Sequence, residues 1–175
     1  MSTGEITIPV KLDAKTFKRF SRFDTFTLRR RWVRPAVFAA ILTAFAIAAL
    51  LSGKPQSALI AGVLLAVGLG LPLVYFATYF YQLNVQAKKQ RLTPPRRVYT
   101  LRMDFDGLRV TNDQVKEDAQ QVRWQDVPAA YKRKGCIYLY LSPVKACLIP
   151  DGQANVPDNE VWAYLKARLG GKCRG

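Results

Sequence analysis

The sequence predicts a membrane α-helical hairpin joined to a small antiparallel β domain with a C-terminal helix, which makes the chain an α+β protein. Two uncharged apolar runs, 35–51 and 58–81, are separated only by the short loop Ser52–Ser57. After them, residues 98–149 hold several short runs typical of strands, and the first of these, from Tyr99, alternates apolar and polar side chains with period two. Four segments are therefore expected, and they are listed here: 1–34, a cytoplasmic strand and basic helix; 35–81, the transmembrane hairpin; 82–97, a basic juxtamembrane extension and linker; and 98–175, the β domain with its helix.

The two apolar runs have the length and composition of membrane spans. About 20 apolar residues in a helix cross a hydrocarbon core that is about 30 Å thick. The run 58–81 is long enough when tilted, and Trp32 and Ser52-Gly53 extend the reach of the shorter run. A hairpin buried in a soluble protein would show a polar face on each helix, and these runs show none. A signal peptide is disfavoured because 34 residues precede the first run and a second run follows at once.

The positive charge of the chain is concentrated beside the apolar runs. Of 27 basic residues, nine precede the first run, and the loop between the runs carries only Lys54. Because basic flanking residues stay in the cytoplasm, both termini are expected on the cytoplasmic side of a cell membrane and the loop on the outer side. Residues 98–175 hold 12 basic and 9 acidic residues, a net charge of +3, so the domain is not expected to bind nucleic acid.

Three basic clusters are candidate contacts for anionic lipid headgroups. Positive side chains at the membrane surface are attracted to anionic lipids. The candidates are Arg29, Arg30, Arg31 and Arg34 before the first span, Lys88 and Lys89 after the second, and Lys132, Arg133 and Lys134 in the domain. A purely topological role for the arginines and a solvated loop at 132–134 are the alternatives. The lipid bilayer is the expected partner in either case.

The residues before the hairpin predict a strand and a basic helix. Alternation over 5–12 predicts an edge strand, because Pro9 lacks an N–H, and its apolar face is expected to pair with strands after the hairpin. Asp13 is a candidate N-cap for the helix. Phenylalanines recur there every three residues, at Phe17, Phe20, Phe23 and Phe26. They either lie on the headgroups or pack on the cytoplasmic domain.

Small residues recur every fourth position in both spans, and such residues let helix backbones approach closely. The stripes are Ala36, Ala40, Ala44 and Ala48 in the first span and Gly62, Ala66 and Gly70 in the second. We expect the two stripes to pack against each other within one chain. The alternative is that one stripe packs on a second copy of the chain or on another membrane protein.

The β domain is expected to contain several short strands and one amphipathic helix. Asp106-Gly107 and Asn112-Asp113 predict turns, and Trp124 lies in phase with Val122 on the apolar side of a strand. The expected elements are listed here: strands at 99–105, 108–111, 121–124, 136–142 and 145–149, a connection at 125–135 that carries the basic run, and a last helix whose apolar stripe is Val161, Trp162, Leu165 and Leu169. The strand 136–142 is apolar on both faces and is expected to be central.

No pattern in the sequence indicates catalysis. Histidine is absent, and the glycines form no phosphate-binding loop. Three cysteines, Cys136, Cys147 and Cys173, show no metal-ligand spacing, and the first two lie in apolar runs. We therefore expect neither an enzyme nor a bound cofactor or metal.

The order of these features resembles the YcxB-like family of bacterial membrane proteins. The resemblance is carried by 122–127 (VRWQDV), 136–140 (CIYLY) and 146–150 (ACLIP), between a two-span hairpin and a final helix. It implies a cytoplasmic domain similar to pleckstrin-homology domains, and it implies no established activity. In the family a basic residue often follows the Ile-Pro pair, where this chain has Asp151.

Two functions fit these features. In the first, the membrane-tethered domain is a binding module for a protein segment or a lipid headgroup. In the second, the chain is a structural or regulatory subunit that assembles with another membrane protein through its hairpin. A groove lined by Lys132, Arg133 and Lys134 would favour the first, and a small-residue stripe left uncovered by the hairpin would favour the second.

Overall fold

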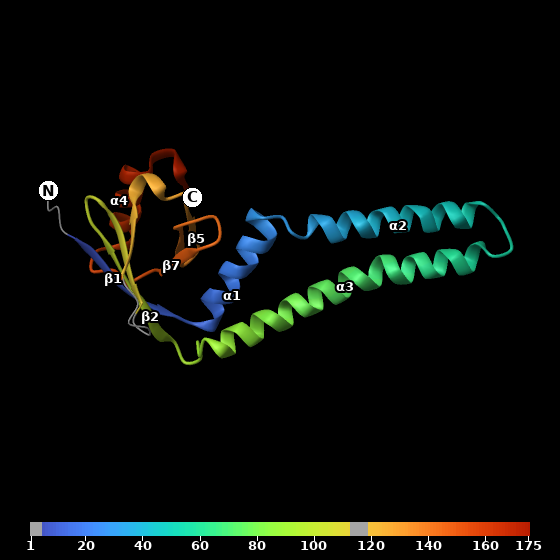
Figure 1. The fold of residues 1–175 in the computed structure, drawn as a ribbon, viewed down its shortest axis with the longest axis horizontal. Coiled ribbons are helices and arrows are strands. Elements are labelled where there is room, and N and C mark those ends of the chain that lie inside the picture. Colours follow the sequence, from blue (N-terminus) through green and yellow to red (C-terminus); the bar gives the residue numbers. More distant parts are fainter. Residues whose placement is uncertain (1–4, 113–118) are drawn as a thin grey trace. The chain divides into compact units, whose positions relative to one another are not determined.

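The computed structural model describes residues 5–112 and 119–175, which form two compact units. The β unit combines the residues up to Phe20 with Arg91–Gly175, and the hairpin unit is Ser21–Gln90 (Figure 1). The chain therefore leaves the β unit after Phe20, beyond the first strand, and returns to it after the hairpin. This is the split arrangement that the apolar face of segment 5–12 predicts.

The hairpin unit contains two long apolar helices in contact, α2 (Val33–Leu51) and α3 (Ser57–Lys89). Both are long and apolar enough to cross a membrane, by length and composition. Only 6% of the apolar window of α2 and 11% of that of α3 is buried, whereas the core helix of a soluble protein would be mostly buried. A π-helical segment, Phe23–Leu28, precedes them. The predicted helical extension beyond residue 81 is present, because α3 continues to Lys89.

The contact between α2 and α3 does not use the small-residue stripes that the sequence suggests. Ala46 is fully buried, Ala61 is 2% exposed, and a Cβ at Gly68 would lie 2.8 Å from Cβ of Leu42. The stripe residues lie elsewhere: Ala36, Ala40, Ala44, Ala48, Gly62 and Ala66 are exposed, and a Cβ at Gly62 or Gly70 would meet nothing within 4 Å. Packing of the two stripes against each other within one chain is therefore wrong.

The geometry of the helix explains this error. Each residue turns the helix by about 100°, so a four-residue repeat drifts by about 40° per step and leaves the contact line within a few steps. The half-buried Ala39 and Leu42 and the buried Ala46 are instead spaced by three and then four residues. That alternation keeps side chains on the seam between two helices that wrap around each other.

The first sheet of the β unit has the strand order β1-β2-β3-β4 and is antiparallel. Its strands are β1 (Ile6–Leu12), β2 (Arg96–Met103), β3 (Gly107–Asn112) and β4 (Gln120–Arg123). Ile8 lies opposite Leu101, and both side chains are fully buried. The prediction that the N-terminal strand pairs with strands after the hairpin is confirmed.

The outer edge of β1 is capped by the segment before the last helix. The amides of Thr7 and Lys11 donate hydrogen bonds to the side chains of Asn155 and Gln153, at 3.1 and 2.7 Å. Pro9 lies between them in the same phase and has no N–H to satisfy. This is the edge position predicted for Pro9, and the capping explains why the edge is not open to another strand.

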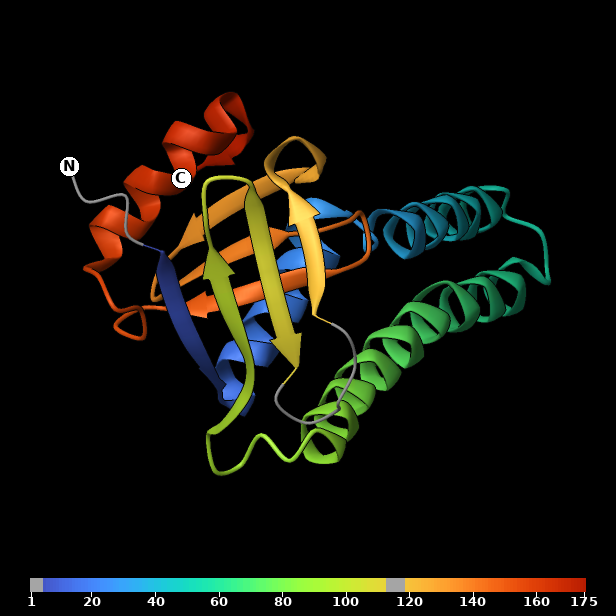
Figure 2. The same ribbon diagram turned by 60° about the vertical axis from the view of Figure 1, so that its left-hand side comes forward.

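The second sheet has the order β7-β6-β5-β8. Its strands are β5 (Ala129–Arg133), β6 (Cys136–Tyr140), β7 (Ala146–Pro150) and β8 (Cys173–Arg174). All five residues of β6 are buried, as predicted for a central strand. The predicted connection 125–135 is wrong, because it contains β5, which pairs with β6 along its whole length. Figure 2 shows the two sheets facing each other, with helix α1 (Ala14–Arg22) behind the second sheet.

Helix α1 packs on the outer face of the second sheet. The amide of Thr16 donates to Oδ1 of Asp13 at 2.9 Å, which confirms the predicted N-cap. The ring of Phe20 lies edge-on to that of Tyr138, with centroids 5.2 Å apart. Of the two alternatives for the phenylalanines, packing on the domain therefore holds for Phe20. Phe26 instead packs inside the hairpin unit, against Tyr79 of α3.

The C-terminal helix α4 (Asp158–Leu169) buries the four side chains of its predicted stripe. It also helps to fix Trp124, which is 8% exposed. Nε1 of Trp124 and the hydroxyl of Tyr164 both donate to the carbonyl of Asp104, at 3.0 and 2.8 Å. The prediction that Trp124 belongs to the core is confirmed, although the residue opens a 3-10 turn immediately after β4.

The turn between β2 and β3 differs from the predicted Asp106-Gly107 turn. Its central residues are Phe105 and Asp106, because the amide of Asp104 donates to the carbonyl of Gly107 across the turn. Gly107 already belongs to β3, where a Cβ would collide with the carbonyl of Val122. Of the predicted turn Asn112-Asp113, Asn112 ends β3 and Asp113 lies outside the described residues.

Candidate functional site

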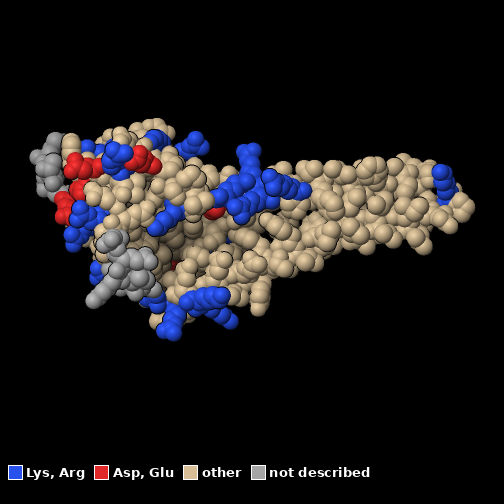
Figure 3. Space-filling view, viewed as in Figure 1, with Lys and Arg blue, Asp and Glu red and all other residues tan. Residues whose placement is uncertain are grey.

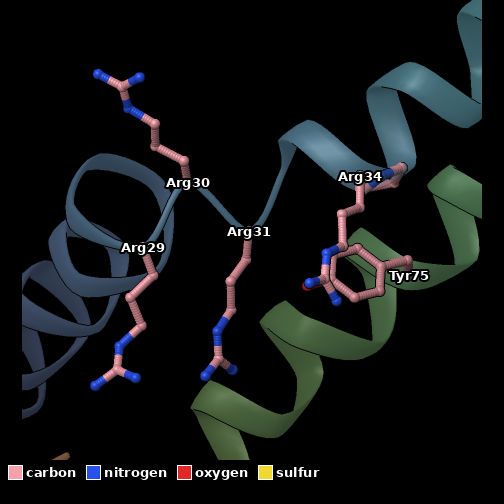
Figure 4. Close-up of a pocket in the computed structure, with 6 residues that line it drawn as sticks. Arg29, Arg30, Arg31, Arg34 and Tyr75 are labelled. Carbon is pink, nitrogen blue, oxygen red and sulfur yellow. The ribbon is translucent and has the colours of Figure 1, made fainter. Parts of the chain in front are cut away.

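The candidate site lies where the chain enters α2. The π-helical segment ends at Leu28, Arg29, Arg30 and Arg31 follow, and α2 begins at Val33. Arg30 has a φ of 47°, a left-handed conformation that is uncommon for any residue with a side chain. Figure 4 shows the consequence, since Arg29 and Arg31 extend to one side of the chain and Arg30 to the other.

Four arginines and two further residues line a hollow of about 560 Å³ in the hairpin unit. We call it the arginine hollow, and its lining is Arg29, Arg30, Arg31, Arg34, Pro35 and Tyr75 (Figure 4). Five of the six come from one stretch of chain, and Tyr75 comes from α3. The hollow therefore combines guanidinium groups with the aromatic ring of a neighbouring apolar helix. Its volume lies in the range of small-ligand sites.

The charge in the hollow is only partly compensated. Nε of Arg29 donates to Oδ2 of Asp24 at 2.8 Å, and both side chains are about three-quarters buried. Within the described ranges, neither Arg31 nor Arg34 has an ion pair with a carboxylate. At least two positive charges therefore remain available to an anion. In Figure 3, blue side chains gather where the hairpin begins, and the surface along α2 and α3 is otherwise mostly tan up to the loop.

Aromatic contacts hold the segment before the four arginines against α3. The ring of Phe26 stacks on that of Phe76 at 6.0 Å and meets Tyr79 edge-on at 5.4 Å. The hydroxyl of Tyr79 donates to the carbonyl of Ser21 at 3.0 Å, and the guanidinium of Arg22 lies 5.5 Å from the ring centroid of Phe80. These contacts attach the segment before the arginines to α3, so the hollow stands on a packed surface.

The other predicted headgroup contacts do not join this hollow. Lys88 and Lys89 are exposed in the last turn of α3. The run 132–134 belongs to the β unit and is not the free loop that the sequence suggests. Lys132 and Arg133 are half-buried residues of β5, and Nζ of Lys132 lies 5.9 Å from the ring centroid of Trp162. Lys134 is exposed, and its carbonyl accepts a hydrogen bond from Arg19.

The β unit has a hollow of its own, of about 470 Å³, which the sequence did not indicate. Phe105 is 72% exposed at its rim, and the guanidinium of Arg168 lies 4.4 Å from the centre of the Phe105 ring. The cations that line it already have partners. Lys172 donates to two backbone carbonyls, and Arg123 pairs with Asp126.

The buried thiols offer no nucleophile. Burial raises the pKa of Cys136 and of Cys147 to about 12, so both stay protonated at neutral pH. Within residues 5–112 and 119–175, no three His, Cys, Asp or Glu side chains are grouped as metal ligands. The chemistry that the described residues offer most clearly is therefore anion binding by arginine.

Comparison of the chain with family models, with curated proteins and with solved structures gave no match. The structure itself defines the class: an α+β chain in which a hairpin of two long apolar helices is inserted between adjacent strands of a sheet.

Proposed function

We propose that this chain is an integral membrane protein that binds anionic lipid headgroups through the arginine hollow and holds its β domain at the cytoplasmic face as a binding module. The observation that carries the proposal is the arginine hollow itself. Arg31 and Arg34, which have no carboxylate partner among the described residues, line it beside helices that have the length and composition of membrane spans. Arginine suits phosphate because its planar fork of donors pairs with two phosphate oxygens at once.

The proposed location is the cell membrane. Both termini, and the basic residues that flank the two apolar runs, would lie in the cytoplasm. Two spans return the chain to its starting side, and the loop between α2 and α3 carries only Lys54. A cysteine introduced at Gln56 should react with an impermeant thiol reagent in intact cells, with Cys173 replaced by serine to lower the background. Labelling at Gln90 instead would contradict this topology.

The β unit is proposed to be a pleckstrin-homology-like module of the YcxB-like type. Support comes from two facing sheets of mainly antiparallel strands that are followed by a C-terminal helix. The hollow beside Phe105 is the surface on which this module would receive a protein segment. The proposed role is binding without catalysis, and it needs no cofactor.

Retention of lipid by the purified protein tests the proposal. The full chain is extracted in detergent, washed, and its bound lipid phosphorus is measured per protein. Arg31→Gln with Arg34→Gln should lower the retained anionic lipid severalfold. Lys88→Gln with Lys89→Gln removes the same charge from exposed positions outside the hollow, and it should change retention little. Equal losses of retained lipid in the two variants would show that the lipid responds only to the total positive charge of the protein and that the hollow is not a specific site.

A second function is favoured by the uncovered small-residue stripes. Ala36, Ala40, Ala44 and Ala48 are exposed on α2, and within the described residues the hairpin itself leaves them uncovered. In this alternative the chain is a structural or regulatory subunit that packs this stripe on another membrane protein or on a second copy. Ala40→Leu with Ala44→Leu should then weaken the association measured by cross-linking in membranes, whereas Phe45→Leu, at an exposed position on another face of α2, should not.

A further inference from the structure

The geometry points to a headgroup with two phosphate groups as the ligand of the arginine hollow. This inference rests on the proposed function and names the lipid class that the hollow selects. A lipid with a single phosphate, at the same total charge in the membrane, would bind less tightly.

Charge counting is the first argument. Asp24 already compensates Arg29, so the hollow does not present four equivalent cations. Arg30 extends to the other side of the chain (Figure 4), so it is not counted with the remaining pair. Arg31 and Arg34 remain without a carboxylate partner among the described residues, and both line the same hollow. A phosphodiester carries one negative charge and engages one guanidinium in the bidentate arrangement. One phosphate would leave the second of these arginines uncompensated, and two phosphates would match both.

The spacing of the arginines is the second argument. Arg31 precedes α2, and Arg34 lies in its first turn. The left-handed backbone at Arg30 turns that side chain away from Arg29 and Arg31 (Figure 4). Residues held in disfavoured backbone conformations cost stability, and they cluster at ligand sites. Figure 4 shows the guanidinium groups of Arg31 and Arg34 at different positions in the hollow, which suits two linked anionic groups better than one.

The surroundings favour a lipid over a free diphosphate. Tyr75 lines the hollow, and Trp32, which is 45% exposed, lies in the chain between Arg31 and Arg34. Tyrosine and tryptophan are enriched at the level of the headgroups. Basic pockets at the cytoplasmic ends of transmembrane helices are a known form of site for multiply charged headgroups. A soluble diphosphate would gain nothing from the aromatic and apolar part of this lining.

Quenching of Trp32 by brominated lipid chains provides the test. The full chain is reconstituted in vesicles of zwitterionic lipid, and a brominated anionic lipid is added. The headgroup of this lipid has either one or two phosphates, and the two series are compared at equal total negative charge. Trp124 and Trp162 are each 8% exposed in the β unit, and the Trp32→Phe variant supplies their background signal. Circular dichroism confirms that each variant is folded.

The expected result is half-maximal quenching at an at least fivefold lower charge concentration of the two-phosphate lipid, since one more paired basic residue is worth about that factor. Arg31→Gln with Arg34→Gln should abolish this preference, and Lys88→Gln with Lys89→Gln should keep it. Equal quenching by both lipids, with loss only in the arginine variant, would overturn the two-phosphate inference and leave the proposed headgroup site intact. Equal quenching by anionic and zwitterionic lipid would overturn both. Displacement of the two-phosphate lipid by micromolar inorganic diphosphate would overturn the lipid assignment.

Discussion

The β unit and the hairpin unit place the same kinds of apolar side chain in opposite environments. In the β unit Ile8, Leu101 and Leu139 are fully buried. In the hairpin unit Leu59 is 71% exposed and Leu73 is 68% exposed. Two facing sheets and two helices can enclose a core, whereas two helices share only one narrow seam. The difference teaches that the β unit encloses its apolar side chains in a core away from water, whereas the hairpin leaves most of its apolar surface uncovered by the chain itself.

Packing energy is therefore concentrated differently in the two units. In the β unit, burial of one large apolar side chain can contribute several kcal/mol to the free energy of unfolding, because the side chain is removed from water on all sides. In a membrane the helices gain little from burying apolar surface, and close contact between small and large residues decides whether they associate. The following predictions separate these two cases, from the largest expected effect to the smallest.

The largest effect is expected for Trp124→Ala in the β unit. The substitution removes a side chain that is 8% exposed, together with its hydrogen bond to the carbonyl of Asp104. A core Trp→Ala change typically costs about 3–5 kcal/mol. Urea unfolding of the full chain in micelles, followed by the labelling rate of the buried cysteines, measures it. Phe105→Ala, at a position 72% exposed, is the control and should cost under about 1 kcal/mol. Equal costs would show that Trp124 is not part of the core.

Much of the β unit could be predicted because its patterns are local. The phase of Ile6, Ile8 and Val10 indicated a covered face, and only strands after the hairpin could cover it. The two-faced apolar strand at 136–140 could only be central. Strand β5 was missed because its residues, Ala129–Arg133, include two small and two basic side chains and show no alternation. Its pairing with β6 creates the strand, and that partner is not visible in the local sequence.

The arginine hollow illustrates what the sequence does not contain. The four arginines were evident as candidate residues, and their basic character predicted a contact with anionic headgroups. The left-handed turn at Arg30 and the salt bridge from Arg29 to Asp24 were not, because the sequence did not indicate the π-helical winding of Phe23–Leu28, which brings Arg29 back to Asp24 and ends just before Arg30. Similarly, Gly107 was assigned to a turn by its type. The structure requires glycine there because the neighbouring strand lies too close for a side chain.

Glycine positions on α3 provide the second prediction, within the hairpin unit. Gly68→Val should separate the helices, because a Cβ there lies 2.8 Å from Cβ of Leu42. The cost should be about 1–3 kcal/mol, as for other overpacked contacts. Gly62→Val is the matched control, since a Cβ at Gly62 meets nothing within 4 Å. The measurement is the loss of helical signal on titration with a denaturing detergent. If the two variants lose their helical signal at the same detergent concentration, α2 and α3 do not make contact at Gly68.

High pH should weaken the β unit more than the hairpin unit. Burial raises the pKa of Cys136 and Cys147 to about 12, above the value of about 9 expected for an exposed thiol. The folded state therefore retains protons that the unfolded state loses. The associated stability is complete below pH 9 and is lost as pH rises from 9 toward 12, by up to about 1.4 kcal/mol per pH unit for each thiol.

Urea midpoints between pH 8 and pH 10.5 measure this effect through the fluorescence of Trp124 and Trp162, in chains that also carry Trp32→Phe so that the tryptophan signal comes from the β unit. The double variant Cys136→Ala, Cys147→Ala should show a flatter pH dependence than the wild-type chain. The hairpin unit contains no cysteine, so its helical signal should change less over the same range. Identical slopes for the wild-type chain and the variant would contradict the assignment of the effect to the thiols.

The smallest effect is expected where a basic side chain rests on an aromatic ring of the β unit. Nζ of Lys132 lies 5.9 Å and Nζ of Lys166 lies 5.7 Å from the ring centroid of Trp162, so two cations share one ring. An exposed cation–π contact contributes about 0.5–1 kcal/mol. Because the two lysines also repel each other, Lys132→Met should cost about 0.5 kcal/mol or less at low salt. Lys134→Met, at an exposed position beyond the strand, should cost nothing measurable. A double-mutant cycle with Trp162→Leu isolates the energy of the contact between Lys132 and Trp162. A coupling energy near zero would show that Lys132 is a solvated charge. Lys132 would then be available for the headgroup contact that the sequence suggested.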